Sequence, residues 1–170
     1  MAKMYFKIAW YMTIVAVAAK LILFLAEFSQ QTMAISTMFI NLLVVLVGSF
    51  FAIRFYKINN PESDIKSEFK AGMRATTLFA LFMGIFVLVY YNYIDTHYFP
   101  NMIEQRVAMA EAEKAKYPEI NVDQAKQFGE ILFSPRTHAT ITLFGLTIVG
   151  ALYSIILAFL MRKISIAKNR

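Results

Sequence analysis

Residues 72–94 read GMRATTLFALFMGIFVLVYYNYI, and this stretch decides the kind of fold that the chain can form. It is a long apolar run with one charged side chain, Arg74, close to its beginning. A helix of about 20 apolar residues is long enough to cross the hydrocarbon core of a membrane. We therefore predict a transmembrane helix over residues 72–94.

Three other stretches have the same apolar character and sufficient length: residues 8–28, 33–56 and 138–161. Of the 170 residues, 59% are hydrophobic and only 16% are charged. A chain this small cannot bury so many apolar side chains in its own core, so lipid has to cover the rest. We therefore predict a single membrane domain over residues 1–170, with an all-α fold that is a four-transmembrane-helix bundle.

The lysines and arginines that flank these spans predict the orientation of the bundle. Eleven lie on one side, namely Lys3, Lys7, Arg54, Lys57, Lys66, Lys70, Arg74, Arg162, Lys163, Lys168 and Arg170. Five lie on the other side, namely Arg106, Lys114, Lys116, Lys126 and Arg136. Because basic residues near the spans are retained on the cytoplasmic side, we expect both termini in the cytoplasm. The same pattern explains the net charge of +6 without a nucleic-acid partner.

The stretch between the third and fourth spans, residues 95–137, is rich in Ala, Glu, Lys, Gln and Met. These residues are good helix formers, so this loop is expected to be helical. Asn121, with a glutamine three residues later, resembles a capping box, and Ser134-Pro135 suits the beginning of the last span. We therefore predict an extracytoplasmic, periplasmic helical hairpin between helices three and four. It either lies on its own bundle or offers a docking surface to a partner.

Small residues at four-residue spacing indicate which helix faces meet in the membrane, because they let two backbones approach closely. One such series lies on the third span and one on the fourth: Gly72, Thr76, Ala80 and Gly84, and Gly150, Ser154 and Ala158. Matching depths in the antiparallel spans pairs Gly84 with Gly150, Ala80 with Ser154, and Thr76 with Ala158. We predict a helix-packing seam there; the alternative is that the same series forms a homodimer contact.

An intramembrane polar cluster is predicted around Lys20. At 1.5 Å per residue, Lys20 lies about 12 Å below Phe28, the outer end of the first span. A cation at such a depth costs roughly 3 kcal/mol. Asn41 lies at the same depth in the second span, and Glu27 lies two helical turns beyond Lys20. We expect a Lys20–Asn41 hydrogen bond with Glu27 above it. Such a cluster serves either as a structural lock or subunit contact, or as part of a transport path.

Residues with catalytic or metal-binding patterns are scarce. The chain contains no cysteine, which excludes disulfides, thiolate metal sites and cysteine nucleophiles. His97 and His138 flank the outer ends of the third and fourth spans beside Asp95, without a spacing that is diagnostic of a metal site. We interpret them as interface histidines, and predict no catalytic residues, cofactor or metal.

Three short motifs carry a resemblance to a known family. Phe69-Lys70-Ala71-Gly72 enters the third span, Ile94-Asp95 ends it, and Phe133-Ser134-Pro135 precedes the last span. This pattern resembles the domain-of-unknown-function 4199 family, which implies a small bacterial inner-membrane protein of unassigned activity. The family usually has proline after the aspartate, whereas Thr96 stands here, so a kink at that junction does not follow from the resemblance.

These observations favour a non-enzymatic integral membrane protein that is a subunit or assembly partner of a cell-envelope membrane complex. Its partners would be the lipid bilayer and either another membrane protein or a second copy of the chain. The alternative is a small carrier for protons or for a lipid-linked sugar, with the intramembrane Lys20 as the binding charge. The sugar is suggested by the family resemblance, because genes of some family members lie near genes for polyprenol-linked glycosyl transfer.

Overall fold

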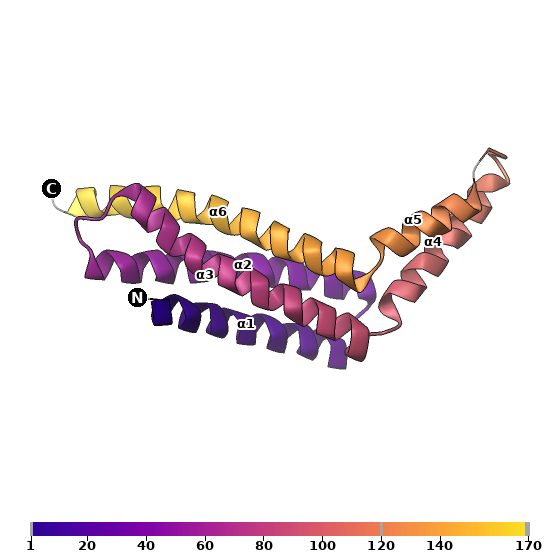
Figure 1. Ribbon diagram of the computed structural model, residues 1–170, viewed down its shortest axis with the longest axis horizontal. Coiled ribbons are helices and arrows are strands. Elements are labelled where there is room, and N and C mark those ends of the chain that lie inside the picture. The colour runs from indigo at the N-terminus through magenta and orange to yellow at the C-terminus, as the bar shows by residue number, and fades with distance from the viewer. Residues whose placement is uncertain (1, 120, 169–170) are drawn as a thin grey trace. The chain divides into compact units, whose positions relative to one another are not determined.

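The computed structural model describes residues 2–119 and 121–168, with side chains described as far as Arg162. Arg170 and the side chains of Lys163 and Lys168, which entered the charge count, lie outside the described residues. In chain order the elements are α1 (Ala2–Leu25), α2 (Gln30–Asn59), α3 (Ile65–Val89), a π-helical turn η1 (Tyr90–Ile94), α4 (Tyr98–Lys114), α5 (Val122–Leu132) and α6 (Pro135–Lys168) (Figure 1). The described residues are thus helical without any strand, which confirms the all-α fold.

Four of these helices are long and apolar enough to cross a membrane: α1, α2, α3 continued by η1, and α6. They coincide with the four predicted spans and extend beyond most of their predicted ends. The third of them is the most enclosed, because 44% of its most apolar stretch is buried, against 22–28% in the others. The length and apolar composition of these helices indicate a membrane protein.

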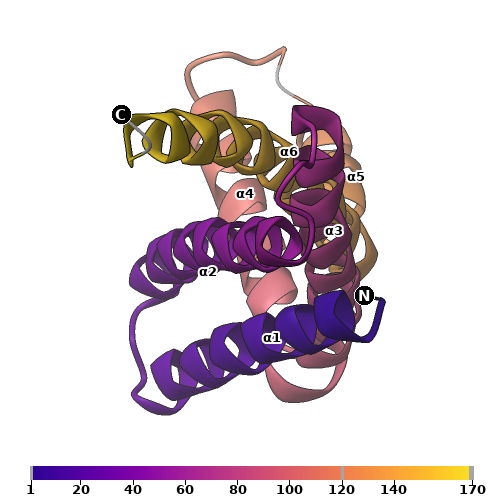
Figure 2. The ribbon, with the colours of Figure 1, turned by 90° about the vertical axis from the view of Figure 1, so that its left-hand side faces the viewer.

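The described residues divide into two compact units. The first contains residues up to Met83 and from Leu143 onward, and the second contains residues 84–142. In the first unit, α3 lies to one side of α1, α2 and α6 (Figure 2). Part of its core is the ring of Tyr5 from α1, which packs against Ala52, Ala71 and Ala75. The three alanines leave room for this ring between the helices, because their side chains are a single methyl group.

The first helix ends earlier than predicted, at Leu25 rather than at Phe28. Glu27 adopts a φ of 55°. The backbone N–H of Glu27 donates to the carbonyl of Phe24 (3.1 Å), and that of Phe28 donates to the carbonyl of Leu23 (3.4 Å). This pair of hydrogen bonds around a left-handed residue is a Schellman motif, which terminates the helix. Ser29 then caps α2, as its side chain accepts a hydrogen bond from the Thr32 N–H.

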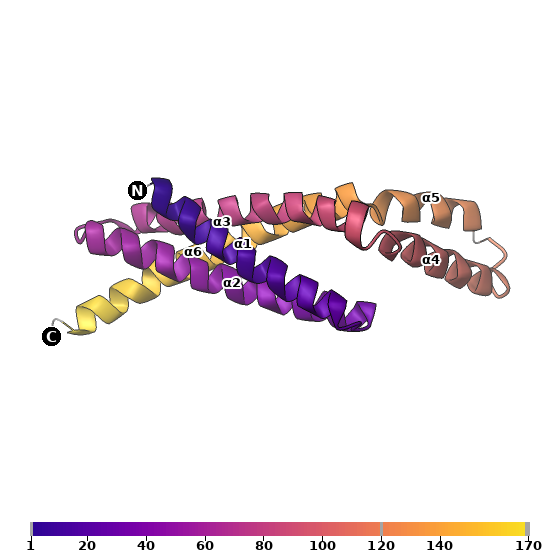
Figure 3. The same ribbon diagram turned by 90° about the horizontal axis from the view of Figure 1, so that it is seen from below.

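The second unit contains α4 and α5, which lie side by side as a helical hairpin (Figures 1 and 3). Gly129 of α5 faces Ile103 of α4, and a Cβ at this glycine would lie 3.8 Å from the Ile103 side chain. The predicted caps are confirmed. Asn121 Oδ1 accepts from the N–H of residue 124 (3.1 Å), and Ser134 Oγ accepts from the N–H of Thr137 (3.2 Å) at the beginning of α6.

Candidate functional site

The most unusual polar group of the first unit is the carboxylate of Glu68, whose side chain is fully buried in the first turn of α3. Burying a charge is costly unless it is paired and hydrogen-bonded. Asp64, just before the helix, positions this turn, because its Oδ1 accepts a hydrogen bond from the Ser67 N–H (3.0 Å). Hydrogen bonds from the side chain and the backbone of Ser67 also hold the pKa of the Asp64 carboxyl below its usual value.

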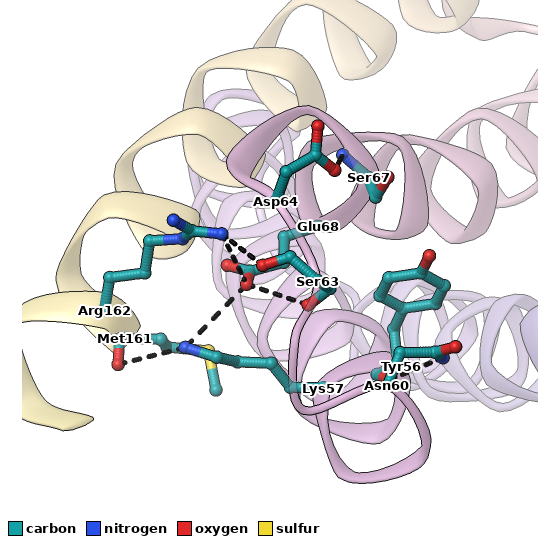
Figure 4. Close-up of polar contacts among 9 residues, drawn as sticks. All are labelled: Tyr56, Lys57, Asn60, Ser63, Asp64, Ser67, Glu68, Met161 and Arg162. Atoms are coloured by element: carbon teal, nitrogen blue, oxygen red, sulfur yellow. Dashed lines mark hydrogen bonds and ion pairs between the residues drawn. The ribbon is translucent and has the colours of Figure 1, made fainter.

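Three other segments of the chain bring partners to Glu68 Oε1 (Figure 4). Ser63 Oγ, from the α2–α3 connection, donates a hydrogen bond of 3.0 Å. The Lys57 ammonium, from the last turn of α2, lies at 3.8 Å, and Arg162 Nη2, from α6, lies at 3.4 Å. We call these four residues the Glu68 cluster. It connects α2, α3 and α6 through one carboxylate.

Further hydrogen bonds hold the two cations in place. Arg162 Nη2 also donates to the backbone carbonyl of Ser63, and Lys57 Nζ donates to the carbonyl of Met161 (3.4 Å) (Figure 4). With two cations and one carboxylate, the cluster carries a formal charge of +1. Within the part of the chain that the structure describes, Glu68 Oε2 and Arg162 Nε are buried without a hydrogen-bond partner. The cluster can therefore hold the ends of α2, α3 and α6 together through one carboxylate.

Sequence reasoning missed this cluster, although a signal for it was present. Glu68 lies four residues before Gly72, and Arg162 lies four residues after Ala158, so each continues one of the two small-residue series by a helical turn. From the sequence, Lys57 and Arg162 were interpreted as basic residues at the inner interface and were not paired with an acid. Extending both series outward would have placed an acid and a base at the same end of one helix pair.

The structure places the two small-residue series against each other, but in another register than predicted. A Cβ added at Gly72 would overlap the Ser154 side chain, and one added at Gly150 would overlap the Thr76 side chain. Thr76 therefore faces Gly150 and not Ala158, which lies eight residues, or about 12 Å, further along α6. The predicted register assumed that both spans end at the same depth. In the observed register, Gly72 and Gly150 each face a side chain with a hydroxyl group.

The other three members of the predicted seam are also buried. Ala80 and Ala158 are fully buried in the first unit. Gly84 is buried in the second unit. The predicted pairing of Gly150 with Gly84 is wrong, because the Thr76 side chain occupies the position opposite Gly150.

The predicted cluster around Lys20 is not assembled as expected. Lys20 is buried, with 6% of its surface exposed. Within the described residues, however, the buried Oδ1 of Asn41 accepts no hydrogen bond. An ammonium group is only a donor, so this oxygen is the atom that a Lys20–Asn41 hydrogen bond would need. Glu27 is exposed in the turn after α1. The prediction placed Glu27 on this helix, above Lys20, but α1 ends two residues before it, at Leu25.

The two histidines lie in the second unit. His97 is exposed, whereas the His138 ring lies edge-on against Tyr91 (5.3 Å between centroids) and Phe99 (5.7 Å). Burial, and then the nearby Asp95 carboxylate, raise the pKa of Tyr98 beside this aromatic group. Among the described residues no three His, Asp or Glu side chains lie close enough together to hold a metal ion.

The helices and the buried ion pairs define a class of protein, a helical membrane protein with four candidate spans and a polar connection at one end of the first unit. The chain belongs to the family described as Protein of unknown function (DUF4199), which matches residues 7–163. The resemblance noted in the sequence is thereby confirmed. No curated protein and no solved structure matches the chain.

Proposed function

We propose that this protein is a non-enzymatic subunit or assembly partner of a cell-envelope membrane complex, in a bacterial inner membrane with both termini in the cytoplasm. The orientation rests on the distribution of basic residues, eleven against five across the spans. The observation that carries the subunit role is an exposed apolar face on the α4–α5 hairpin. With this orientation the hairpin lies in the periplasm, where a second envelope protein can reach it.

The exposed face belongs to α5. Phe128, Ile131 and Leu132 are 65%, 67% and 45% exposed, and their spacing of three and four places them on one side of the helix. Gly129, on another side of α5, packs against Ile103 of α4. A large apolar surface that remains exposed outside the spans is typical of a protein contact. A contiguous Phe, Ile and Leu face fits an apolar groove or helix of a partner subunit.

The test is purification of the tagged protein from its native membrane in a mild detergent, followed by mass spectrometry. We expect a partner in stoichiometric amount, and we expect Phe128→Ser and Ile131→Ser to lose it. Glu130→Ser, on the same helix, is the matched control and is expected to retain the partner. A protein that purifies alone or only with further copies of itself would contradict the proposal. Retention of the partner by the two apolar variants would move the contact elsewhere.

A second candidate function is transport of protons or of a lipid-linked sugar, and the observation that favours it is the burial of Lys20 inside α1. A buried intramembrane cation is often a binding charge for a proton or an anion. The discriminating measurement is proton uptake by reconstituted vesicles, with Lys20→Met as the variant. Lys7→Met is the control, because Lys7 is exposed near the beginning of α1. Uptake that only Lys20→Met abolishes would favour the carrier over the subunit.

A further inference from the structure

A groove of about 520 Å³ lies between α1 and α3, in the first unit. Its lining includes Tyr5, Met73, Thr77 and Leu78, and two basic residues, Lys70 and Arg74, also line it. Both basic side chains are exposed, and their spacing of four residues places them one turn apart on the same face of α3. The groove thus has a mainly apolar lining with two cations beside it.

The buried Tyr5 side chain forms the base of this groove. It is 2% exposed and is held between α1 and α3 by Ala71 and Ala75. The guanidinium carbon of Arg74 lies 5.7 Å from the centre of the Tyr5 ring, a distance at which a cation is attracted to an aromatic face. The Tyr5 ring therefore positions the Arg74 guanidinium beside the groove.

The charge of Lys70 and Arg74 is not balanced by acidic residues of α1 and α3, the two helices that form the groove. The sequence of α1 contains no Asp or Glu. Glu68 is the one acidic residue of α3, and its carboxylate is engaged by Lys57 and Arg162 in the Glu68 cluster. A ligand that complements this site carries a negative charge next to an apolar chain.

We propose that the groove binds an anionic phospholipid, with the headgroup phosphate between Lys70 and Arg74 and an acyl chain along Met73, Thr77 and Leu78. Basic residues at the end of a groove between membrane helices suit anionic headgroups. A guanidinium and an ammonium can both donate charge-assisted hydrogen bonds to the oxygens of one phosphate. Free phosphate would use the cations but would leave the apolar lining without a ligand, so a lipid satisfies more of the site.

The protein contains its own probe for such a lipid. Trp10 is its single tryptophan, and the Trp10 ring lies 6.0 Å from Phe82, one helical turn beyond Leu78 on α3. Brominated acyl chains quench tryptophan on contact. The experiment reconstitutes the full chain in phosphatidylcholine vesicles and compares quenching by brominated phosphatidylglycerol with quenching by brominated phosphatidylcholine. We expect the anionic lipid to quench at a lower mole fraction.

Two double variants separate a built site from general attraction to anionic lipid. Lys70→Gln with Arg74→Gln is expected to abolish the preference, at roughly fivefold for each cation removed. Lys3→Gln with Lys66→Gln removes the same charge from exposed positions outside the groove and is expected to retain the preference. Equal losses in both double variants would overturn the proposal in favour of a diffuse surface potential.

A third variant tests the position of the acyl chain. Thr77→Phe fills the groove without changing its charge, so we expect it to weaken quenching by the anionic lipid. Unchanged quenching in this variant would overturn the placement of the chain. Inorganic phosphate is expected to leave the quenching unaltered, and full recovery of Trp10 fluorescence on its addition would identify a site for free anions instead. Circular dichroism of each variant verifies that its helices are intact.

Discussion

Replacing Arg162 by glutamine removes one of the two cations that neutralise Glu68. The Arg162 Nη2 and Glu68 Oε1 atoms lie 3.4 Å apart, which corresponds to about 5 kcal/mol of attraction at an effective dielectric constant of about 20. The arginine side chain is 34% exposed, so water screens part of this energy. Breaking a buried pair typically costs about 3–5 kcal/mol, and after screening we expect a loss of about 2–3 kcal/mol in the free energy of unfolding.

The cost depends on which partner is removed. Arg162→Gln leaves a carboxylate that is inaccessible to water, with the Lys57 ammonium 3.8 Å away as its remaining cation. Glu68→Gln instead leaves two cations that are 19% and 34% exposed and can be hydrated, while Ser63 can still donate to the amide oxygen. We therefore expect Glu68→Gln to destabilise less than Arg162→Gln. The double variant should be more stable than the sum of the two single losses predicts.

The assay is thermal unfolding of the purified protein in detergent micelles at constant lipid and salt. For a chain of this length, a loss of 2–3 kcal/mol lowers Tm by about 8 °C. Lys66→Gln, an exposed cation on the same turn of α3, is the control and should leave Tm unchanged. The reasoning is refuted if Arg162→Gln behaves like this control, or if the two single effects are additive in the double variant.

Three further predictions follow from other contacts. Gly72→Ala should lower Tm, because its Cβ would overlap a side chain of α6 and overpacking costs about 1–3 kcal/mol, whereas Gly145→Ala, with no neighbour within 4 Å, should not. Because the pKa of Asp64 is lowered in the folded state, its contribution to stability is present above the unfolded pKa and is lost as pH falls through the folded pKa. In a plot of Tm against pH, Asp64→Asn should therefore lack this part of the decrease in Tm at acidic pH. The cysteine-free chain allows a test of the proposed orientation, in which Lys116→Cys should react with an impermeant thiol reagent in intact spheroplasts and Glu62→Cys only after permeabilisation; the reverse pattern would invert the topology.

The features that could be predicted from sequence depend on short-range patterns. The spans follow from apolar runs, and the caps at Asn121 and Ser134 follow from side chains that reach a backbone N–H three residues away. The end of α1 was harder to locate. Glu27 is the residue with positive φ there, and glycine or asparagine is the usual signal for that conformation.

The register between α3 and α6 could not be obtained from residue type alone. Glycines spaced by four are compatible with several shifts of one helical turn, and equal depth of the span ends was a poor criterion for choosing among them. The observed shift sets Gly72 against Ser154 and brings Arg162 within reach of Glu68. This combination of steric fit and ion pairing depends on both helices together, so no pattern within one of them reveals it.

The Glu68 cluster has a consequence for the order in which the chain is made. Synthesis proceeds from the N-terminus, so Lys57, Ser63 and Glu68 emerge long before Arg162 on the last helix. Until α6 docks, the Glu68 carboxylate has one cation where the finished protein has two. A chain truncated before α6 retains this under-neutralised acid, together with the open small-residue face of α3. Such a fragment would be a substrate for membrane quality control, and docking of the last helix would mark the chain as complete.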